Sequence, residues 1–445
     1  MISKLRLGAK QTLAIGFALI ILIGAFLLMI PAASSNGQGI TFINALFTSA
    51  SATCVTGLVV FDTWTQFSFF GQFIILILIQ IGALGFMTVA ILFSIVLGKR
   101  IGLKERTFLM ETVNAMQISG VVRLVRRILI GTLLFEGIGA LVLAFRFYPY
   151  FGFPNNIWYG IFHSVSAFCN AGFDLMGIIE PYTSLTPFVS DYVINFTIIS
   201  LIIIGGVGFV VWDNIFEHRF RFKNYNLHTK IVLSATVILI VFSTIMFLVL
   251  EKNTVFQDMP IHQRTIAALF QSVTPRTAGF NTVDTALLSE GGVLYTLFLM
   301  VIGAAPGSTA GGIKITTFVI VVLSVINHSR KKNDVNVFNR RLEEDLIKRA
   351  YSNTVFYVLV CMFGVFALTA IQDIPVKDAL FESSSAIGTV GLSTGITRDL
   401  NDFSRIVIIL LMYIGRLGSL TLFMAVAERR VHAQLKNPVE KIIIG

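Results

Sequence analysis

Four short stretches of small residues, each ending in glycine, are the part of this sequence best suited to bind an ion. They read TCVTG (53–57), CNAG (169–172), RTAG (276–279) and GTVG (388–391). Small side chains and a glycine allow the backbone to turn its carbonyl oxygens inward, and rings of carbonyl oxygens can replace the hydration water of a monovalent cation. The candidate ion-binding residues are Thr53, Val55, Thr56, Gly57, Asn170, Ala171, Gly172, Thr277, Ala278, Gly279, Thr389, Val390 and Gly391.

Other kinds of site are not indicated. No carboxylate recurs at matching positions of the four stretches, which argues against a calcium or magnesium site built from acidic side chains. The three cysteines have no CxxC spacing and the six histidines form no HExxH, so neither a zinc site nor a disulfide framework is predicted. The run GGIKITT lacks the G-K-[ST] order of a phosphate-binding loop. These observations favour transport or sensing over catalysis.

Each glycine stretch follows a copy of one motif, [AG]-[LI]-F-x-S-x-[ST]. The copies are ALFTSAS (45–51), GIFHSVS (160–166), ALFQSVT (268–274) and ALFESSS (379–385). The glycine comes ten residues after the phenylalanine in three copies and nine residues after it in the third. Their apolar pattern suits a half-helix that enters the membrane, followed by a loop that leads back out. The alternative is an amphipathic helix in a plain surface loop.

Apolar runs place the chain in a membrane. It has 445 residues, of which 55% are hydrophobic and 13% charged, and runs of about 20 apolar residues can cross the hydrocarbon core as helices. We predict an all-α membrane protein with eight spans and read the first run as a retained span rather than a cleaved signal. The spans are expected near residues 12–32, 72–97, 122–147, 190–214, 228–250, 290–326, 350–371 and 402–427.

Charge orients these spans, because Lys and Arg collect in cytoplasmic loops. Basic residues are concentrated in 1–10, 98–127, 217–230, 327–349 and 428–445, which predicts that both termini are cytoplasmic. The net charge of +10 then reflects topology and anionic lipid rather than nucleic acid. The loops at 98–127, 217–230 and 327–349 also form a candidate docking face, since VNVFNRRLEEDLIKRA has an amphipathic pattern.

A second pattern recurs in the later span of each unit: IGALG (81–85), IGGVG (204–208), IGAAPG (302–307) and IGRLG (414–418). Taken singly, such small residues indicate helix packing. At four equivalent positions they indicate four equivalent spans that meet at one axis. An even number of spans separates the copies, so we expect parallel repeats around a central pore. The repeats are assigned to residues 1–115, 116–222, 223–345 and 346–445.

The third copy breaks its own span. IGAAPGSTAGGIKITT (302–317) contains a proline and four glycines, which unwind a helix, and unwound backbone at membrane depth must line a wet cavity or be buried in protein. A loop just inside the pore could obstruct ions or admit them. The candidate gating residues are Gly303, Pro306, Gly307, Ser308, Thr309, Ala310, Gly311, Gly312, Lys314 and Arg416.

Three charged residues lie at membrane depth. Arg416 is costly in lipid and should face the axis, where it could repel cations or hold the loop through its carbonyls. Lys314 could extend to a wet vestibule or pair with a carboxylate. Glu136 is the single acid of its span, and two roles stay open for it: a hydrogen bond or ion pair between helices, and a proton or sodium site.

At this point the sequence resembles the TrkH/KtrB/HKT superfamily of potassium transporters, and within it the membrane subunits of bacterial Ktr systems. The resemblance covers nearly the whole chain and is carried by TPRTAGF (274–280), PGSTAGGIKITT (306–317) and the four loop glycines. It implies that Gly57, Gly172, Gly279 and Gly391 line a selectivity filter that favours potassium over sodium, with sodium dependence left open, and that the third intramembrane loop is the gate. A full TVGYG is absent, so fewer carbonyl layers are expected.

The resemblance also implies partners and a location. Relatives of this kind form homodimers in the plasma membrane on a cytoplasmic nucleotide-binding ring, and the tail NPVEKIIIG (437–445) would pack at the dimer contact. No organic cofactor and no enzymatic activity are expected. The main alternative is a secondary carrier coupled to sodium or protons, which predicts paired intramembrane acids and inverted halves. A membrane enzyme is the other alternative considered, and no catalytic pairing lies on a span.

Overall fold

The computed structural model describes residues 9–85, 120–219, 221–331 and 334–418, together with the single residues 88, 102 and 110. Residues 1–8 of the predicted basic segment 1–10, the segment 428–445 with the tail at 437–445, and most of the loop at 98–127 lie outside these residues. Within the described residues, the regular secondary structure is helical apart from one short hairpin of β1 (Asn336–Val337) and β2 (Arg340–Arg341).

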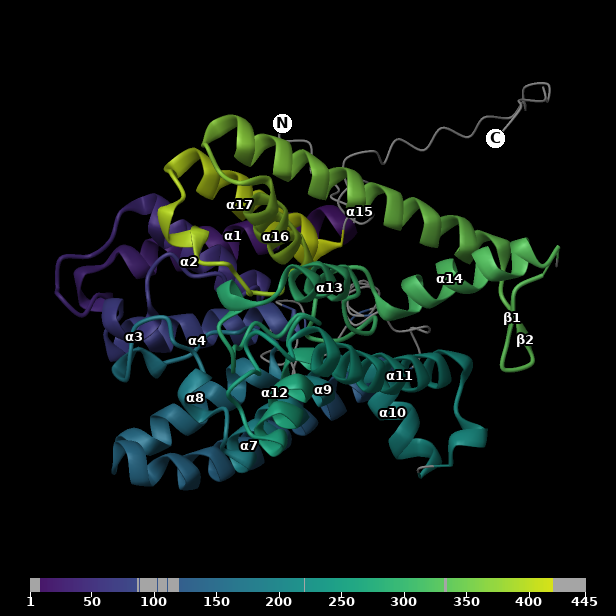
Figure 1. Cartoon of the computed structure of the whole chain (residues 1–445), viewed down its shortest axis with the longest axis horizontal. Coiled ribbons are helices and arrows are strands. Elements are labelled where there is room, and N and C mark those ends of the chain that lie inside the picture. The colour runs from purple at the N-terminus through teal and green to yellow at the C-terminus, as the bar shows by residue number, and fades with distance from the viewer. Residues whose placement is uncertain are drawn as a thin grey trace.

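Four long helices cross the molecule, and Figure 1 shows them beside a set of shorter ones. They are α1 (Ala9–Met29), α7 (Val121–Phe151), α11 (Leu227–Leu250) and α15 (Glu344–Ile371). Among the described residues these four are long and apolar enough to span a membrane, and a fifth span results if the bent pair α9–α10 is counted as one. The prediction of a membrane protein is therefore confirmed. Helix length and composition identify four or five of the eight predicted spans.

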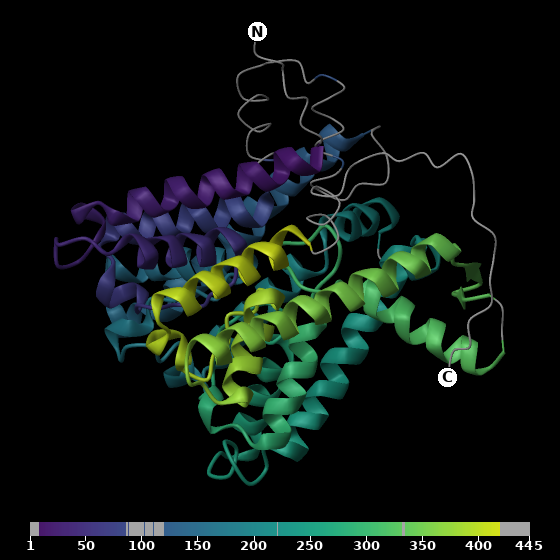
Figure 2. The same cartoon turned by 90° about the horizontal axis from the view of Figure 1, so that it is seen from above.

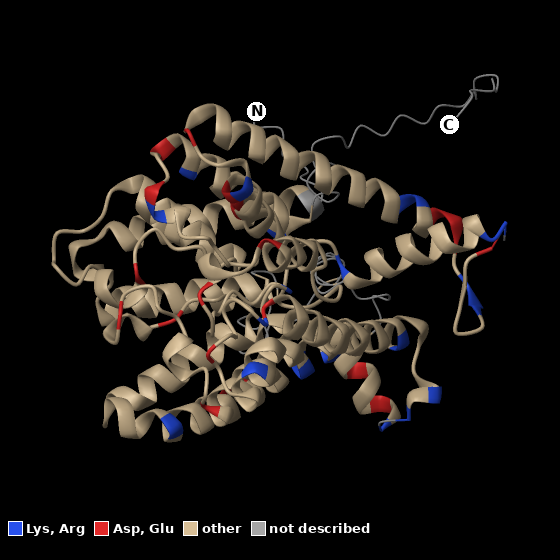
Figure 3. Ribbon diagram, in the orientation of Figure 1, with Lys and Arg blue, Asp and Glu red and all other residues tan. Residues whose placement is uncertain are grey.

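The outer faces of the long helices are apolar. Leu133, Leu141 and Phe145 of α7 are 71%, 74% and 87% exposed. A soluble protein rarely exposes so many large apolar side chains on one helix, so this face suits lipid. Figure 3 shows that α15 carries its charged residues at its amino-terminal end, while the rest of the helix has none.

A short helix follows each long one and contains one copy of the phenylalanine motif. These helices are α2 (Phe42–Cys54), α8 (Asn155–Phe168), α12 (Ile261–Val273) and α16 (Val376–Gly388). The motif phenylalanines, Phe47, Phe162, Phe270 and Phe381, are all 0% exposed. Each short helix packs on the long helix before it, so the plain surface loop considered from the sequence is wrong.

In the first two units, the first serine of the motif ties the short helix to the long one. Ser49 Oγ donates to the carbonyl oxygen of Ile21 in α1 at 2.7 Å, and Ser164 Oγ donates to that of Glu136 in α7 at 2.7 Å. Gly24 and Gly139 allow this approach, because a Cβ there would lie 2.3 and 2.5 Å from these serine hydroxyls. Small residues thus let the two helices pack closely, as in other membrane helix pairs.

Each unit then continues into further helices, which are shorter than the long ones. These are α4 (Phe69–Leu84), α9 (Tyr192–Gly206) with α10 (Phe209–His218), α13 (Glu290–Val301) with α14 (Ile315–Ser329), and α17 (Asp402–Leu417). Short elements connect the helices: α3 (Thr63–Gln66), η1 (Pro31–Ala33), η2 (Met176–Ile178), η3 (Thr186–Phe188), η4 (Phe222–Asn224), η5 (Thr285–Leu287) and η6 (Ile396–Asp399).

The last glycine of IGxxG ends or bends these later helices. Gly85, Gly208 and Gly418 have φ values of 79°, 94° and 83° and follow α4, α9 and α17. At Gly208 the axis turns by 93° between α9 and α10. The span predicted at 190–214 is thus two helices joined by a bend, because a glycine with positive φ cannot continue a right-handed helix. Residues 302–314, between α13 and α14, are irregular.

The units pack in a closed cycle. Helix α4 of the first unit contacts the short helix α8 of the second, α9 contacts α12, α13 contacts α16, and α17 returns to α2. The views in Figures 1 and 2 agree with this order and show α14 and α15 forming an arm that carries the β1–β2 hairpin away from the other helices. Each short helix is thus enclosed by its own unit and by the preceding one.

Close packing at the IGxxG glycines gives a first prediction. A Cβ at Gly82 of α4 would lie 2.0 Å from the carbonyl oxygen of Thr53, so Gly82→Ala must push two backbones apart. We expect a loss of about 1–3 kcal/mol in the free energy of unfolding, measured in detergent. Gly137→Ala is the matched control, because nothing lies within 4 Å of a Cβ at that helical glycine; equal stability of the two variants would contradict the packing argument.

Candidate functional site

The four glycine loops have the same backbone conformation. The residue two positions before each glycine is left-handed although it is not glycine: Val55, Asn170, Thr277 and Thr389 have φ values of 58°, 57°, 71° and 51°. The glycines Gly57, Gly172, Gly279 and Gly391 have φ values of 90°, 70°, 82° and 90°. Left-handed β-branched residues are uncommon and costly, and they persist where the surrounding structure holds them. Four equivalent turns therefore follow the four short helices.

These turns lie against one another in a ring. A Cβ at Gly57 would lie 2.5 Å from the carbonyl oxygen of Ala171, and one at Gly172 would lie 2.8 Å from that of Ala278. The contacts continue from Gly279 to the Val390 oxygen at 2.6 Å, and from Gly391 to the Thr56 oxygen at 2.3 Å. The cycle closes after four steps, and a side chain at any of the four glycines would collide with the next loop.

The structure thus brings together the loop residues identified from the sequence. Thr53 is the exception: it belongs to helix α2, and its carbonyl oxygen lies against Gly82 of α4. The carboxyl ends of α2, α8, α12 and α16 all lead into the ring, and helix carboxyl ends carry partial negative charge. Backbone oxygens and helix dipoles together favour a cation here.

The last residue of the motif holds each loop in place, and the sequence analysis missed this role. Thr56 N–H donates to the carbonyl oxygen of Ser51 at 2.8 Å, and Gly57 N–H donates to the Ser51 hydroxyl at 3.1 Å. Ser385 makes the same two bonds, to Val390 at 2.8 Å and Gly391 at 3.1 Å. The signal was present, because this position is always serine or threonine.

The other two units use the same residue differently. Ser166 Oγ donates to the carbonyl oxygen of Phe173 at 2.6 Å, and Thr274 Oγ1 donates to that of Phe280 at 2.6 Å. Both hydroxyls therefore hold the residue after the loop glycine instead of the glycine itself. In all four units a short helix fixes its own loop through one side chain.

A cavity of about 200 Å³ opens beyond the ring. All four loop glycines line it, together with Asp62, Asp174, Asp284 and Arg398. Asp62 caps α3 and accepts the N–H of Tyr182 at 3.0 Å, which joins the loops of the first two units. Burial raises the pKa of Asp174 to about 7, and the nearby Asp62 charge acts in the same direction. The cavity thus contains a carboxyl group that titrates near neutral pH.

The irregular segment 302–314 lies on the other side of the ring. It is joined to the break between α9 and α10, since Ala305 N–H donates to the Gly206 oxygen at 3.0 Å and Phe209 N–H donates to the Gly307 oxygen at 2.8 Å. It also contacts two of the glycine loops. Thr309 Oγ1 donates to Asn170 Oδ1 at 3.3 Å, and a Cβ at Gly311 would lie 2.3 Å from Thr389 Oγ1.

Two cations hold this segment through its carbonyl oxygens. The Arg416 guanidinium donates to the oxygens of Thr309, Gly82 and Ala83, the last at 3.0 Å. Lys314 Nζ donates to the Ala310 oxygen at 2.7 Å. Of the two roles considered for Arg416, contact with the loop carbonyls is present. Lys314 pairs with no carboxylate among the described residues and lines a cavity.

Glu136 makes hydrogen bonds between helices. Gln80 Nε2 of α4 donates to it at 3.2 Å, and the Cys169 thiol donates at 3.7 Å. Both partners are neutral, and within the described part of the chain no second carboxylate joins them in a group of three or more metal-ligating side chains. The hydrogen-bonding role is therefore the one with geometric support.

The chain is similar to known transport proteins over its full length. It matches the TrkH family, described as cation transport protein, over residues 9–433. It is 41% identical over 446 residues to Ktr system potassium uptake protein B of Bacillus subtilis, covering 100% of this chain and 98% of that protein. It is 40% identical over 449 residues to the potassium/sodium uptake protein NtpJ of Enterococcus hirae, covering 99% and 98%.

A solved structure has the same fold. The chain superposes on the potassium transporter TrkH from Vibrio parahaemolyticus with a TM-score of 0.75 and 19% identity, over 95% of this chain and 86% of that one. The family match and the two relatives confirm the resemblance to KtrB-type membrane subunits. This protein belongs to the TrkH family of cation transport proteins.

Proposed function

We propose that this chain carries potassium ions across the cell membrane through the ring of four glycine loops. The observation that supports this most is the closed cycle of contacts from Gly57 to Gly172, Gly279, Gly391 and back. Four turns in one conformation around one axis can offer carbonyl oxygens from all sides, which is how a filter replaces the water around a monovalent cation. Relatives described as potassium and potassium/sodium uptake proteins support the choice of ion.

The driving force would be the membrane potential, which supplies about 2.3 kcal/mol per charge for each 100 mV. An ion would enter from the cavity that contains Asp62, Asp174 and Asp284, where carboxylates raise the local cation concentration. It would pass the ring and meet the segment 302–314, which we assign as the gate. Lys314 and Arg416 hold that gate closed through the carbonyl oxygens of Ala310 and Thr309.

The proposed topology has eight spans in four parallel repeats, with both termini in the cytoplasm. Each repeat would consist of a long helix, a short half-helix and a later helix that is shortened or bent at IGxxG. The arm of α14, the β1–β2 hairpin and α15 would then lie on the cytoplasmic side. Together with the basic loop 217–230 it is a plausible contact for a nucleotide-binding regulatory ring, on which two copies of this chain would form a homodimer.

A carrier coupled to sodium or protons is not favoured. Such a mechanism needs ionisable partners within the membrane, whereas the buried Glu136 is bonded to an amide and a thiol. Tracer flux in liposomes separates the two functions. A filter passes labelled potassium in either direction according to the electrochemical gradient, whereas coupled movement of a second ion would contradict the proposal.

Substitution of one ring glycine tests the filter. Gly57→Ser places a side chain where a Cβ would meet the Ala171 oxygen at 2.5 Å, at a φ of 90°. A displaced ring binds potassium less well. A loss of about 1.4 kcal/mol in the binding preference for potassium over sodium lowers the ratio of the two affinities tenfold. We expect the potassium-to-sodium uptake ratio in transport-deficient cells to fall about tenfold.

Gly37→Ser is the matched control for this substitution. Gly37 also has positive φ, 67°, but nothing lies within 4 Å of a Cβ there. This variant should keep the parent uptake ratio. If Gly57→Ser also keeps it while reaching the membrane normally, the filter assignment is wrong.

Shortening the intramembrane segment tests the gate. Deletion of Ala310–Gly312 removes the carbonyl oxygens to which Lys314 donates and shortens the segment beside the Arg416 partner Thr309, so we expect basal potassium flux in liposomes to rise. Lys314→Gln is the milder variant: it loses a charged hydrogen bond of about 1.5–3 kcal/mol to the closed segment, so flux should rise about tenfold or more. A fall in flux for both variants, at normal protein content, would contradict a gating role.

External pH tests the cavity beyond the ring. Because the pKa of Asp174 is about 7, this carboxyl is neutral below that pH and negative above it. The apparent KM for potassium uptake should therefore fall as external pH rises through about 7. Asp174→Asn should flatten this dependence, whereas an unchanged profile in that variant would exclude Asp174 as the titrating group.

A further inference from the structure

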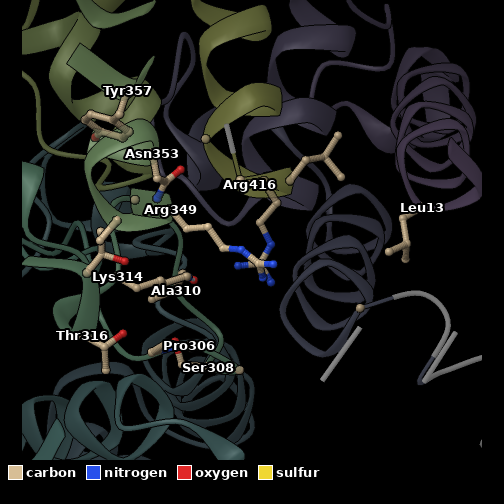
Figure 4. Close-up of a pocket in the computed structure, with 18 of the residues that line it drawn as sticks. Leu13, Pro306, Ser308, Ala310, Lys314, Thr316, Arg349, Asn353, Tyr357 and Arg416 are labelled. Atoms are coloured by element: carbon tan, nitrogen blue, oxygen red, sulfur yellow. Dashed lines mark hydrogen bonds between the residues drawn. The ribbon is translucent and has the colours of Figure 1, made fainter. Parts of the chain in front are cut away.

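A second cavity lies on the side of the segment 302–314 that faces away from the glycine ring. Its volume is about 430 Å³, within the usual range for small-molecule sites, and none of the four ring glycines lines it. The walls come from α1, from the amino-terminal half of α15, from the ends of α4 and α17, from the starts of α10 and α14 and from the segment itself. Figure 4 shows the side chains that enter it.

Three cationic side chains line this cavity: Lys314, Arg349 and Arg416. Figure 4 shows Arg349 and Arg416 extending from different helices toward the same region. Among the described residues no aspartate or glutamate lines the cavity, and none of the three cations forms an ion pair. Like charges directed into one enclosure repel each other, so an anion between them would be stabilised.

Arg349 is the most informative of the three. Lys314 and Arg416 donate part of their N–H groups to backbone oxygens of the gate segment and α4. Arg349 has no hydrogen bond to any described residue, although it extends from α15 into the cavity. Its planar guanidinium group, with five N–H donors, can therefore bind a ligand. The arrangement of these donors matches the oxygens of a phosphate group.

A helix amino terminus opens into the same cavity. Helix α14 begins at Ile315 directly after Lys314, and no side chain caps it. The Ile315 N–H is bonded to the Ala304 oxygen at 3.0 Å, whereas Thr316 and Thr317 of the first turn line the cavity. Free N–H groups and the positive end of a helix dipole bind anions. This adds a second, independent feature to the three cations.

We propose that this cavity binds a phosphate group, either on a soluble molecule or on the headgroup of an acidic lipid. Phosphate oxygens accept charge-assisted hydrogen bonds from guanidinium and ammonium groups such as those of Arg349 and Lys314. The site is separate from the ring of glycine loops, since none of the four ring glycines lines it.

Occupation of the site would act on the gate, and this consequence rests on the proposed function. Lys314 and Arg416 hold the segment through neutral carbonyl oxygens, and a phosphate is a stronger acceptor than a carbonyl. A bound phosphate would therefore compete for both side chains and loosen the segment. It would also neutralise cations that oppose the passage of potassium. Both effects raise flux.

The test is a binding measurement that does not involve transport. The full chain is reconstituted in discs of phosphatidylcholine, and binding of labelled inorganic phosphate is measured at constant ionic strength. Arg349→Gln should weaken binding about tenfold or more, since a charged hydrogen bond is lost. Lys348→Gln is the matched control, because it removes the same charge from the preceding position of α15, which does not line the cavity, and should bind as the parent does.

A second arm identifies the source of the phosphate. Discs that contain phosphatidic acid, without inorganic phosphate, are compared by native mass spectrometry for retained lipid in the parent and in Arg349→Gln. Binding that depends on Arg349 in either arm supports the site and names its source. No binding in both arms, or equal binding by the parent and Arg349→Gln, overturns it. Because neither arm measures ion flux, failure of the potassium proposal would leave this result intact.

Discussion

The close approach of backbone to backbone at glycine is the constraint on which this structure depends. Around the ring each loop touches the next where only a hydrogen atom fits, as between Gly391 and the Thr56 oxygen. Glycine also allows close backbone contact where the later helices pack on the short ones. A Cβ at Gly205 would lie 2.0 Å from the Phe168 carbonyl oxygen, and one at Gly415 would lie 2.1 Å from that of Ile387. Lipid offers no hydrophobic force between helices, so small residues that permit close packing decide which surfaces associate.

This constraint explains why the four units need one another. A short helix has only one long helix in its own unit beside it, and the later helix of the preceding unit covers another side. The strained turns at Val55, Thr277 and Thr389 persist because both neighbours and the Ser or Thr of the motif hold them. Strained backbone survives only where surrounding contacts over-determine it. The ring is therefore a property of the closed cycle, and no single unit could form it alone.

The repeating features could be predicted from the sequence because they depend on local pattern. The glycine loops, the phenylalanine motif and the interruption at 302–314 are all visible as residue types at fixed spacing. The bend at Gly208 was missed because IGGVG looks the same as IGALG and IGRLG, and nothing local distinguishes a bend from a helix end. Contact of Arg416 with the loop carbonyls was one of two roles that the sequence left open, and the folded chain was needed to choose between them and to identify Thr309, 107 positions away, as a partner. The loop-holding role of Ser51 and Ser385 was visible as a constant residue type, but its bonds required geometry.

The third unit departs from the other three, and the departure has a physical logic. Its loop is one residue shorter and its later helix is interrupted, so the segment 302–314 crosses to the second unit at Gly206 and to the fourth at Thr389. A segment that touches two other units can respond to movement in either. Cations hold it at its oxygens, and cations are the groups least compatible with a path for positive ions. In the structure, carbonyl oxygens compensate part of this charge. Under the proposed gating, a stronger acceptor such as phosphate would have to replace them when the segment moves, and an anion would then control the movement of a cation.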